Sequence, residues 1–80
     1  MVALSNELAE YINAAGNVNR VKIHRITSYR APLAKMRSDE RLEPVATKFY
    51  AVIKAVEQGN LSAVVSLTQE AMALASGVET

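Results

Sequence analysis

The sequence predicts an all-α fold, a small bundle of four to five helices that forms a single domain over residues 1–80. Apolar residues recur at steps of three and four along most of the chain, which is the spacing of one face of a helix. Glycine and proline fall between these stretches, where helices end or begin. No apolar–polar alternation typical of a strand persists along the chain.

The first expected helix carries an apolar stripe formed by Leu4, Leu8, Tyr11, Ile12 and Ala15. Gly16 provides its end, because glycine readily adopts the left-handed conformation of a helix C-cap. Asn17 or Asn19 can cap the following helix, since an asparagine side chain accepts a hydrogen bond from a free backbone N–H group.

The second apolar stripe runs through Val18 or Val21, then Ile23, Ile26, Tyr29, Leu33 and Met36. Pro32 interrupts it, because its ring disfavours helical geometry at Ala31 and it lacks a backbone donor. Two outcomes remain open. The helix kinks at Pro32, or it ends near Arg30 and a short helix restarts with Pro32 in its first turn.

The chain then enters a third helical stretch. Acidic residues gather ahead of it, and Pro44 places its start nearer Glu43 than Ser38, since proline belongs in a first turn. Its stripe consists of Val45, Phe49, Val52 or Ile53, and Val56. The pair Gly59–Asn60 ends it.

A last helix carries Leu61, Val64, Leu67, Ala71 and Leu74 on one face and is expected to end at Gly77. The short connection predicts an antiparallel helical hairpin.

Composition excludes several classes of site. The chain has no cysteine and a single histidine, so disulfides, thiolate metal sites and a histidine-based zinc site are not expected, and no cofactor is implied. The longest apolar runs are far shorter than the roughly 20 residues that cross a bilayer, and no targeting signal is evident, so we expect a cytoplasmic protein without membrane contact. An 80-residue core is thin, which favours self-association.

The most distinctive feature is a basic segment. Residues 17–38 hold six of the nine Lys and Arg residues and no Asp or Glu, although the whole chain has a net charge of only +1. The candidate partner- or nucleic-acid-binding residues are Arg20, Lys22, Arg25, Arg30, Lys35 and Arg37. Such a segment favours an acidic partner, a small anion or nucleic acid. Tyr29 and Tyr50 could stack on bases, or each could be half-buried at the edge of the core. The alternative is that its cations pair with glutamates of neighbouring helices.

No catalytic constellation is evident. A nucleophile–histidine–acid arrangement would have to use His24, which stands between Ile23 and Arg25, and a surface histidine on a basic helix explains it equally well. Two acidic pairs, Glu7 with Glu10 and Asp39 with Glu40, lie near expected helix starts, where they would complement helix dipoles. No glycine-rich loop suited to phosphate is present. We therefore expect a protein that is not an enzyme.

Residues 3–76 resemble the C-terminal part of the helical effector-binding and dimerisation (FCD) domain of GntR-type transcription regulators. The resemblance rests on Ala15-Gly16-Asn17 after a helix, Tyr29-Arg30, the helix KFYAVIKAVEQGN (Lys48 to Asn60) and a final amphipathic helix (Leu61 to Ala75). It implies a transcription-regulating role and dimerisation. Many members bind a metal, but the matching positions here hold Leu4, Leu8, Phe49 and Ala71, which cannot ligate, so no metal site is implied. Eighty residues would make up only part of that domain, and its DNA-binding winged helix is absent.

These observations favour a non-enzymatic helical interaction or regulatory module that binds an acidic macromolecular partner through residues 20–37. We expect a homodimer, because alanines on the first and last helices permit close approach of two copies; they are Ala9, Ala14, Ala15, Ala63, Ala71 and Ala75. The same alanines could instead pack within one chain. One alternative function is a nucleic-acid-binding transcription regulator. Another is a small-molecule effector-binding domain with a closed apolar pocket between the second and third helices.

Overall fold

The structure is a computed structural model that describes the backbone of residues 2–79 and the side chains of residues 3–76. It contains five α-helices: α1 (Val2–Asn13), α2 (Arg20–Thr27), α3 (Arg30–Met36), α4 (Glu43–Gln58) and α5 (Leu61–Glu79). The residues described contain no strand. The prediction of an all-α fold is therefore confirmed.

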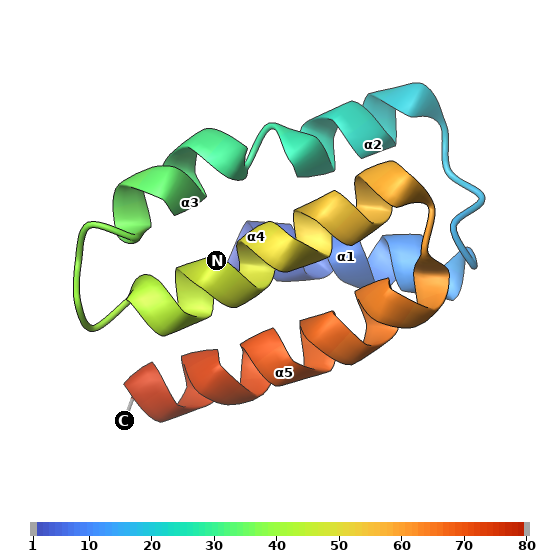
Figure 1. Cartoon of the computed structure of the whole chain (residues 1–80). Coiled ribbons are helices and arrows are strands. Elements are labelled where there is room, and N and C mark those ends of the chain that lie inside the picture. Colours follow the sequence, from blue (N-terminus) through green and yellow to red (C-terminus); the bar gives the residue numbers. More distant parts are fainter. Residues whose placement is uncertain (1, 80) are drawn as a thin grey trace.

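Helix α4 occupies the middle of the molecule (Figure 1). Helix α5 lies along one side of α4 and runs in the opposite direction, while α2 and α3 follow one another along the other side. Helix α1 packs against α5 and α2. The consecutive helices α2 and α3 thus form a ledge beside α4, and this ledge carries most of the basic segment.

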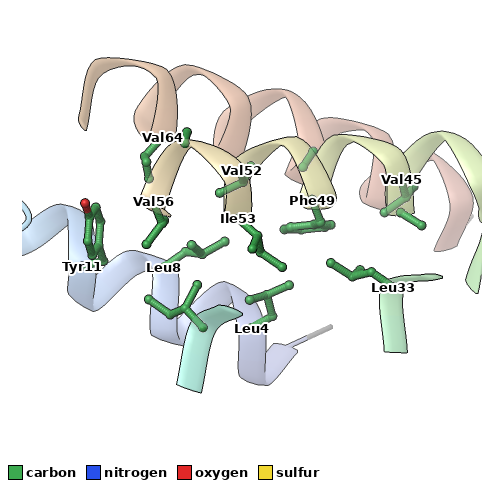
Figure 2. Close-up of a cluster of buried hydrophobic side chains, with 14 residues drawn as sticks. Leu4, Leu8, Tyr11, Leu33, Val45, Phe49, Val52, Ile53, Val56 and Val64 are labelled. Carbon is green, nitrogen blue, oxygen red and sulfur yellow. The ribbon is translucent and has the colours of Figure 1, made fainter. Parts of the chain in front are cut away.

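The core is built around α4 (Figure 2). Among the residues whose side chains are described, fourteen apolar ones are buried, and half of them belong to this one helix: Val45, Ala46, Phe49, Val52, Ile53, Ala55 and Val56. The other four helices contribute the remaining seven, which are Leu4, Leu8, Tyr11, Ile26, Leu33, Val64 and Ala71. The stripe expected over this helix is therefore buried throughout, including both alternatives at positions 52 and 53.

Val21, one of two alternatives for the second stripe, and Leu74, assigned to the stripe of the last helix, both lie outward. Val21 is 64% exposed, whereas Val18 packs against the core, so Val18 is the correct choice of the two. Val21 and Ile23 are separated by about 200° around the helix axis, and α2 turns Ile23 inward. Leu74, near the end of α5, is 38% exposed.

Helix α1 ends at Asn13, two residues before the expected stripe does. The two residues ahead of Asn17 both adopt left-handed backbone conformations, with φ of 54° at Ala15 and 80° at Gly16. The Gly16 N–H donates to the Tyr11 carbonyl at 3.0 Å, which closes the helix end. Ala15 lies outside the helix and is exposed, so its place in the buried stripe was wrong.

Asn19 caps α2. Its Oδ1 atom accepts a hydrogen bond from the backbone N–H of Lys22 at 2.9 Å, and its own backbone is extended. Of the two possible caps, the structure therefore selects Asn19 over Asn17.

Pro32 separates α2 from α3 rather than kinking a single helix. In a continuous helix its missing N–H would bond to the Ser28 carbonyl, and its ring would clash there. The break falls at that point: Ser28 and Tyr29 lie between the helices, and Pro32 sits in the first turn of α3. The Thr27 and Ser28 hydroxyls donate to the carbonyls of His24 and Arg25, at 3.1 and 2.6 Å, which satisfies the end of α2.

Helix α4 begins at Glu43 with Pro44 in its first turn, as the sequence indicates. Gly59 ends it with φ of 69°, and Asn60 Oδ1 accepts from the Ala63 N–H at 3.2 Å at the start of α5. The expected end at Gly77 was wrong, because α5 continues to Glu79. A glycine inside a helix lowers its stability by about 1 kcal/mol but does not by itself end it.

Candidate anion-binding surface

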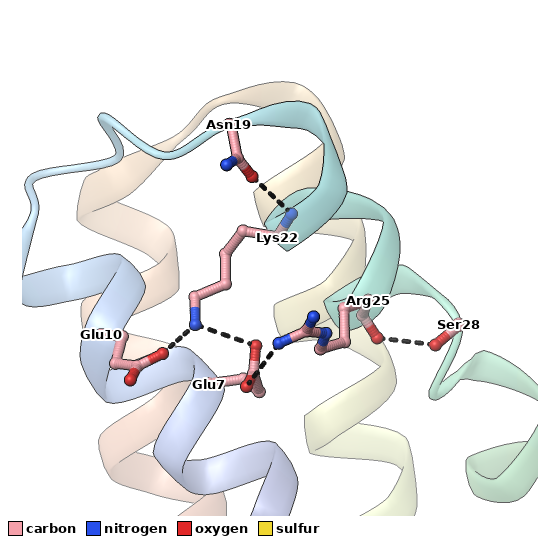
Figure 3. A network of polar contacts seen from close by, with 6 residues as sticks. All are labelled: Glu7, Glu10, Asn19, Lys22, Arg25 and Ser28. Atoms are coloured by element: carbon pink, nitrogen blue, oxygen red, sulfur yellow. Dashed lines mark hydrogen bonds and ion pairs between the residues drawn. The ribbon is translucent and has the colours of Figure 1, made fainter.

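The basic side chains of the α2–α3 ledge point toward two different neighbouring helices. Lys22 and Arg25 are directed toward α1 (Figure 3), whereas Arg30, at the start of α3, reaches α4. Positions 22 and 25 are three residues apart and share one side of α2. The basic segment therefore forms more than one surface.

Two glutamates of α1 neutralise the α1-facing side of α2 (Figure 3). Lys22 Nζ lies 3.1 Å from Glu7 Oε2 and also pairs with Glu10. Arg25 Nη1 lies 3.7 Å from the other Glu7 oxygen. The Lys22 and Glu7 side chains are only 20% and 16% exposed, so this pair is shielded from solvent. Lys22 and Arg25 therefore bind α1 and are less available to a partner than the sequence suggested.

Arg30 is also paired within the chain, through Nη2 to Glu57 of α4. This ion pair ties the start of α3 to the end of α4. The Arg30 Nε atom is buried and has no hydrogen-bond acceptor among the described residues. Part of the guanidinium donor capacity is therefore unused.

The remaining three candidates have no ion-pair partner in the described part of the chain: Arg20 at the start of α2, and Lys35 and Arg37 at the end of α3. The Arg37 guanidinium lies 5.9 Å from the centre of the Tyr50 ring, and Lys54 Nζ lies at the same distance. Both distances are within the range of a cation–π contact. Lys54 stands outside the basic segment in sequence, so only the packing of α3 beside α4 identifies it.

An open hollow of about 570 Å³ lies where α2, α3 and α4 meet. It is lined by Arg20, Ile23, His24, Thr27, Arg30 and Glu57. A second hollow, of about 390 Å³, adjoins the start of α2 and includes Lys22 and Arg25, which α1 already engages. The first hollow is open and is lined by charged and polar residues with one apolar side chain, Ile23, unlike the closed apolar pocket that the effector-binding alternative predicts.

A third hollow, of about 290 Å³, lies between α1 and α5. No charged residue lines it; its walls are Ser5, Asn6, Ala9, Ile12, Asn13, Thr68, Gln69 and Met72. Met72 is 50% exposed there. This surface differs in character from the charged ledge on α2 and α3.

Among residues whose side chains are described, no three acidic or histidine residues cluster closely enough to hold a metal ion. Leu4, Leu8, Phe49 and Ala71, the positions that the resemblance to FCD domains matched with metal ligands, are all buried in the core. Within the described residues, no helix combines the length and apolar character needed to cross a bilayer.

Comparisons with known protein families, curated proteins and solved structures found no match. The resemblance to FCD domains therefore stays a prediction.

Proposed function

We propose that this chain is a non-enzymatic helical interaction module, acting as a dimer, that binds an acidic macromolecular partner through the α2–α3 ledge. The observation that supports this proposal most directly is that Arg20, Lys35 and Arg37 have no carboxylate partner within the described chain. In a chain of net charge +1, unpaired cations gathered on one ledge attract a negative surface. The helices α4 and α5 serve as the packed platform beneath it.

The separation of these cations favours a large partner over a small anion. Arg20 and Arg37 are seventeen positions apart on nearly continuous helix, which corresponds to about 25 Å at the helical rise of 1.5 Å per residue. A single small anion cannot contact both ends of the ledge, whereas an extended acidic segment can.

The partial burial of Tyr29 and Tyr50 favours an acidic protein over nucleic acid as the partner. Tyr29 and Tyr50 are both partly buried and pack against the core, which leaves little of each ring for a base to stack on. Tyr50 in addition has Arg37 and Lys54 near its ring. Nucleic acid is therefore the alternative partner, and the binding experiment below compares it with an acidic peptide.

We assign self-association to the uncharged α1–α5 hollow. Two copies of a neutral face can meet without repulsion, and interface cores are depleted in charge and enriched in methionine. Ala9 and Met72 are exposed in this hollow. Ala71, which the sequence also offered for the contact, is buried inside one chain and contributes to its core instead.

The ledge is tested by binding to a polyglutamate peptide and to a single-stranded oligonucleotide of similar length at low ionic strength. We expect polyglutamate binding that weakens as salt rises and that the double variant Arg20→Gln/Arg37→Gln reduces about tenfold. Lys35→Gln should weaken binding, while Lys48→Gln, with the same change in net charge on the α4–α5 side, should not. Tight oligonucleotide binding with weak peptide binding would favour the nucleic-acid alternative, and failure of both probes would refute the ledge as a binding surface.

Self-association is tested separately by light scattering on the wild type and on Met72→Glu. A wild-type dimer that Met72→Glu converts to a folded monomer is expected, because the charge would be buried without a partner. Ser66→Glu, on an exposed part of α5 outside the hollow, is the matched control. A monomeric wild type at high protein concentration would exclude the dimer.

A further inference from the structure

We infer that the hollow between α2, α3 and α4 is a phosphoryl-binding site, in which Arg20, His24 and Arg30 hold a phosphorylated side chain of the acidic partner. This inference rests on the proposed function and specifies the chemistry at one end of the ledge. It depends on which side chains the fold brings together, on the balance of charge among them and on the unused donor capacity of Arg30.

The three donors come from two helices and share one hollow. Arg20 and His24 are four residues apart, so they stand one turn apart on the same side of α2, and Thr27 continues that row. Arg30 enters the hollow from α3. The break at Ser28 and Tyr29 directs Arg30 from a second helix, so the donors can approach one ligand from different directions.

The charge in this hollow is not balanced. Two guanidinium groups, from Arg20 and Arg30, face one carboxylate, from Glu57, which leaves a charge of +1 even with a neutral His24. On the α1-facing side of α2, Lys22 and Arg25 are matched by Glu7 and Glu10. The excess positive charge of α2 is therefore concentrated in this hollow.

Arg30 has donors to spare. Glu57 pairs with Nη2, and the Arg30 side chain is still 44% exposed, so other N–H groups of the guanidinium are open to a ligand even though Nε is buried. A guanidinium carries five N–H donors, and an acceptor-rich ligand can use those that a single carboxylate leaves free. Arg20 has no ion-pair partner in the described chain and can turn toward the same ligand.

These features fit a phosphoryl group better than a carboxylate. A phosphoryl group carries up to two negative charges and three oxygens, enough to bridge two guanidinium groups and an imidazole. A carboxylate supplies one charge and two oxygens, and Glu57 already fills that role within the chain. Glu57 thus opposes the incoming ligand by competing for Arg30, so its removal should strengthen binding.

The experiment titrates inorganic phosphate, a phosphoserine-containing acidic peptide and its unphosphorylated form into the protein, followed by NMR shifts of the residues lining the hollow. We expect shifts at Arg20, His24 and Arg30 and about tenfold tighter binding of the phosphopeptide than of its unphosphorylated form. Binding of inorganic phosphate alone, with no difference between the two peptides, would assign the site to free phosphate and overturn the assignment to a partner side chain.

Two variants with opposite expected effects on phosphate affinity extend the test. Glu57→Gln should tighten phosphate binding about fivefold, and Arg20→Gln should weaken it about fivefold, which is about 1 kcal/mol in either direction. Arg20 forms no ion pair with the residues that the structure describes, so its variant is expected to fold. Lys48→Gln is the control for net charge. Unchanged affinity in both variants would overturn the site. If polyglutamate binding still responded to Lys35→Gln in that case, the proposed function would stand without it.

Discussion

Glu7 and Lys22 form an ion pair that joins α1 to α2, with 3.1 Å between Glu7 Oε2 and Lys22 Nζ. Arg25 contacts the same glutamate, so one carboxylate holds two cations of the basic segment. Both Glu7 and Lys22 are largely shielded from water, which strengthens their attraction relative to an exposed pair. The contact therefore stabilises the packing of α1 on α2. It also makes Lys22 and Arg25 less available to a binding partner.

Replacing Glu7 with Gln should lower the free energy of unfolding by about 1–2 kcal/mol, since Arg25 loses its carboxylate and the partly buried Lys22 keeps only Glu10. Urea denaturation followed by circular dichroism measures this. Glu70→Gln breaks the more exposed Lys48–Glu70 pair and should change stability by less than about 0.5 kcal/mol. Equal effects of the two variants would show that shielding of Glu7 contributes nothing.

Asn19→Ala should destabilise the protein by about 1 kcal/mol, because the Lys22 N–H loses its side-chain acceptor at the start of α2. Asn17→Ala removes the same side chain two positions earlier, where no cap forms, and should be close to neutral. Thermal unfolding of the two variants compares them directly. If both lost equal stability, the cap assignment would be wrong.

Ala15→Gly should stabilise the protein, by up to about 1 kcal/mol. Alanine at φ of 54° is strained by its Cβ, and glycine has no such penalty. Ala14→Gly introduces the same residue at a neighbour without a positive φ, and should instead destabilise through the greater freedom of the unfolded chain. Chemical denaturation that gave both changes the same sign would count against the left-handed conformation at Ala15.

Phe49→Ala should lower the free energy of unfolding by about 3–5 kcal/mol, because it opens a cavity in the core where the middle of α4 packs. An 80-residue domain typically has a total stability of roughly 4–12 kcal/mol, so this loss removes a large share of the stability and should lower Tm clearly. Phe49→Leu retains most of the apolar volume and should cost about 1.5 kcal/mol or less. A small loss in the alanine variant, seen by calorimetry, would contradict the central place of Phe49.

The features that sequence reasoning predicted well depend on a few neighbouring residues. Pro44 marks the start of α4 and Gly59 its end, because proline and glycine each impose a local backbone geometry. The apolar repeat along α4 is likewise read from one helix alone. Val18 and Val21 could not be separated in this way, since Val18 lies in the connection before α2 and its burial follows from packing rather than from a helical repeat.

The candidate site was only partly predictable for a different reason. The sequence shows that six cations lie close together, but pairing depends on which helices become neighbours. Glu7 and Lys22 are fifteen positions apart, and Arg30 and Glu57 are twenty-seven apart, so no local pattern joins them. The place of Lys54 beside Arg37 at the Tyr50 ring follows from the same packing.

The packing of α1 on α5 has a consequence for the order of folding. Helix α5 begins 48 positions after α1 ends, whereas only two residues connect α4 to α5. Closing a long loop costs more entropy than closing a short one, so contacts between distant segments form more slowly. We therefore expect α4 and α5 to pair during refolding before α1 packs against α5.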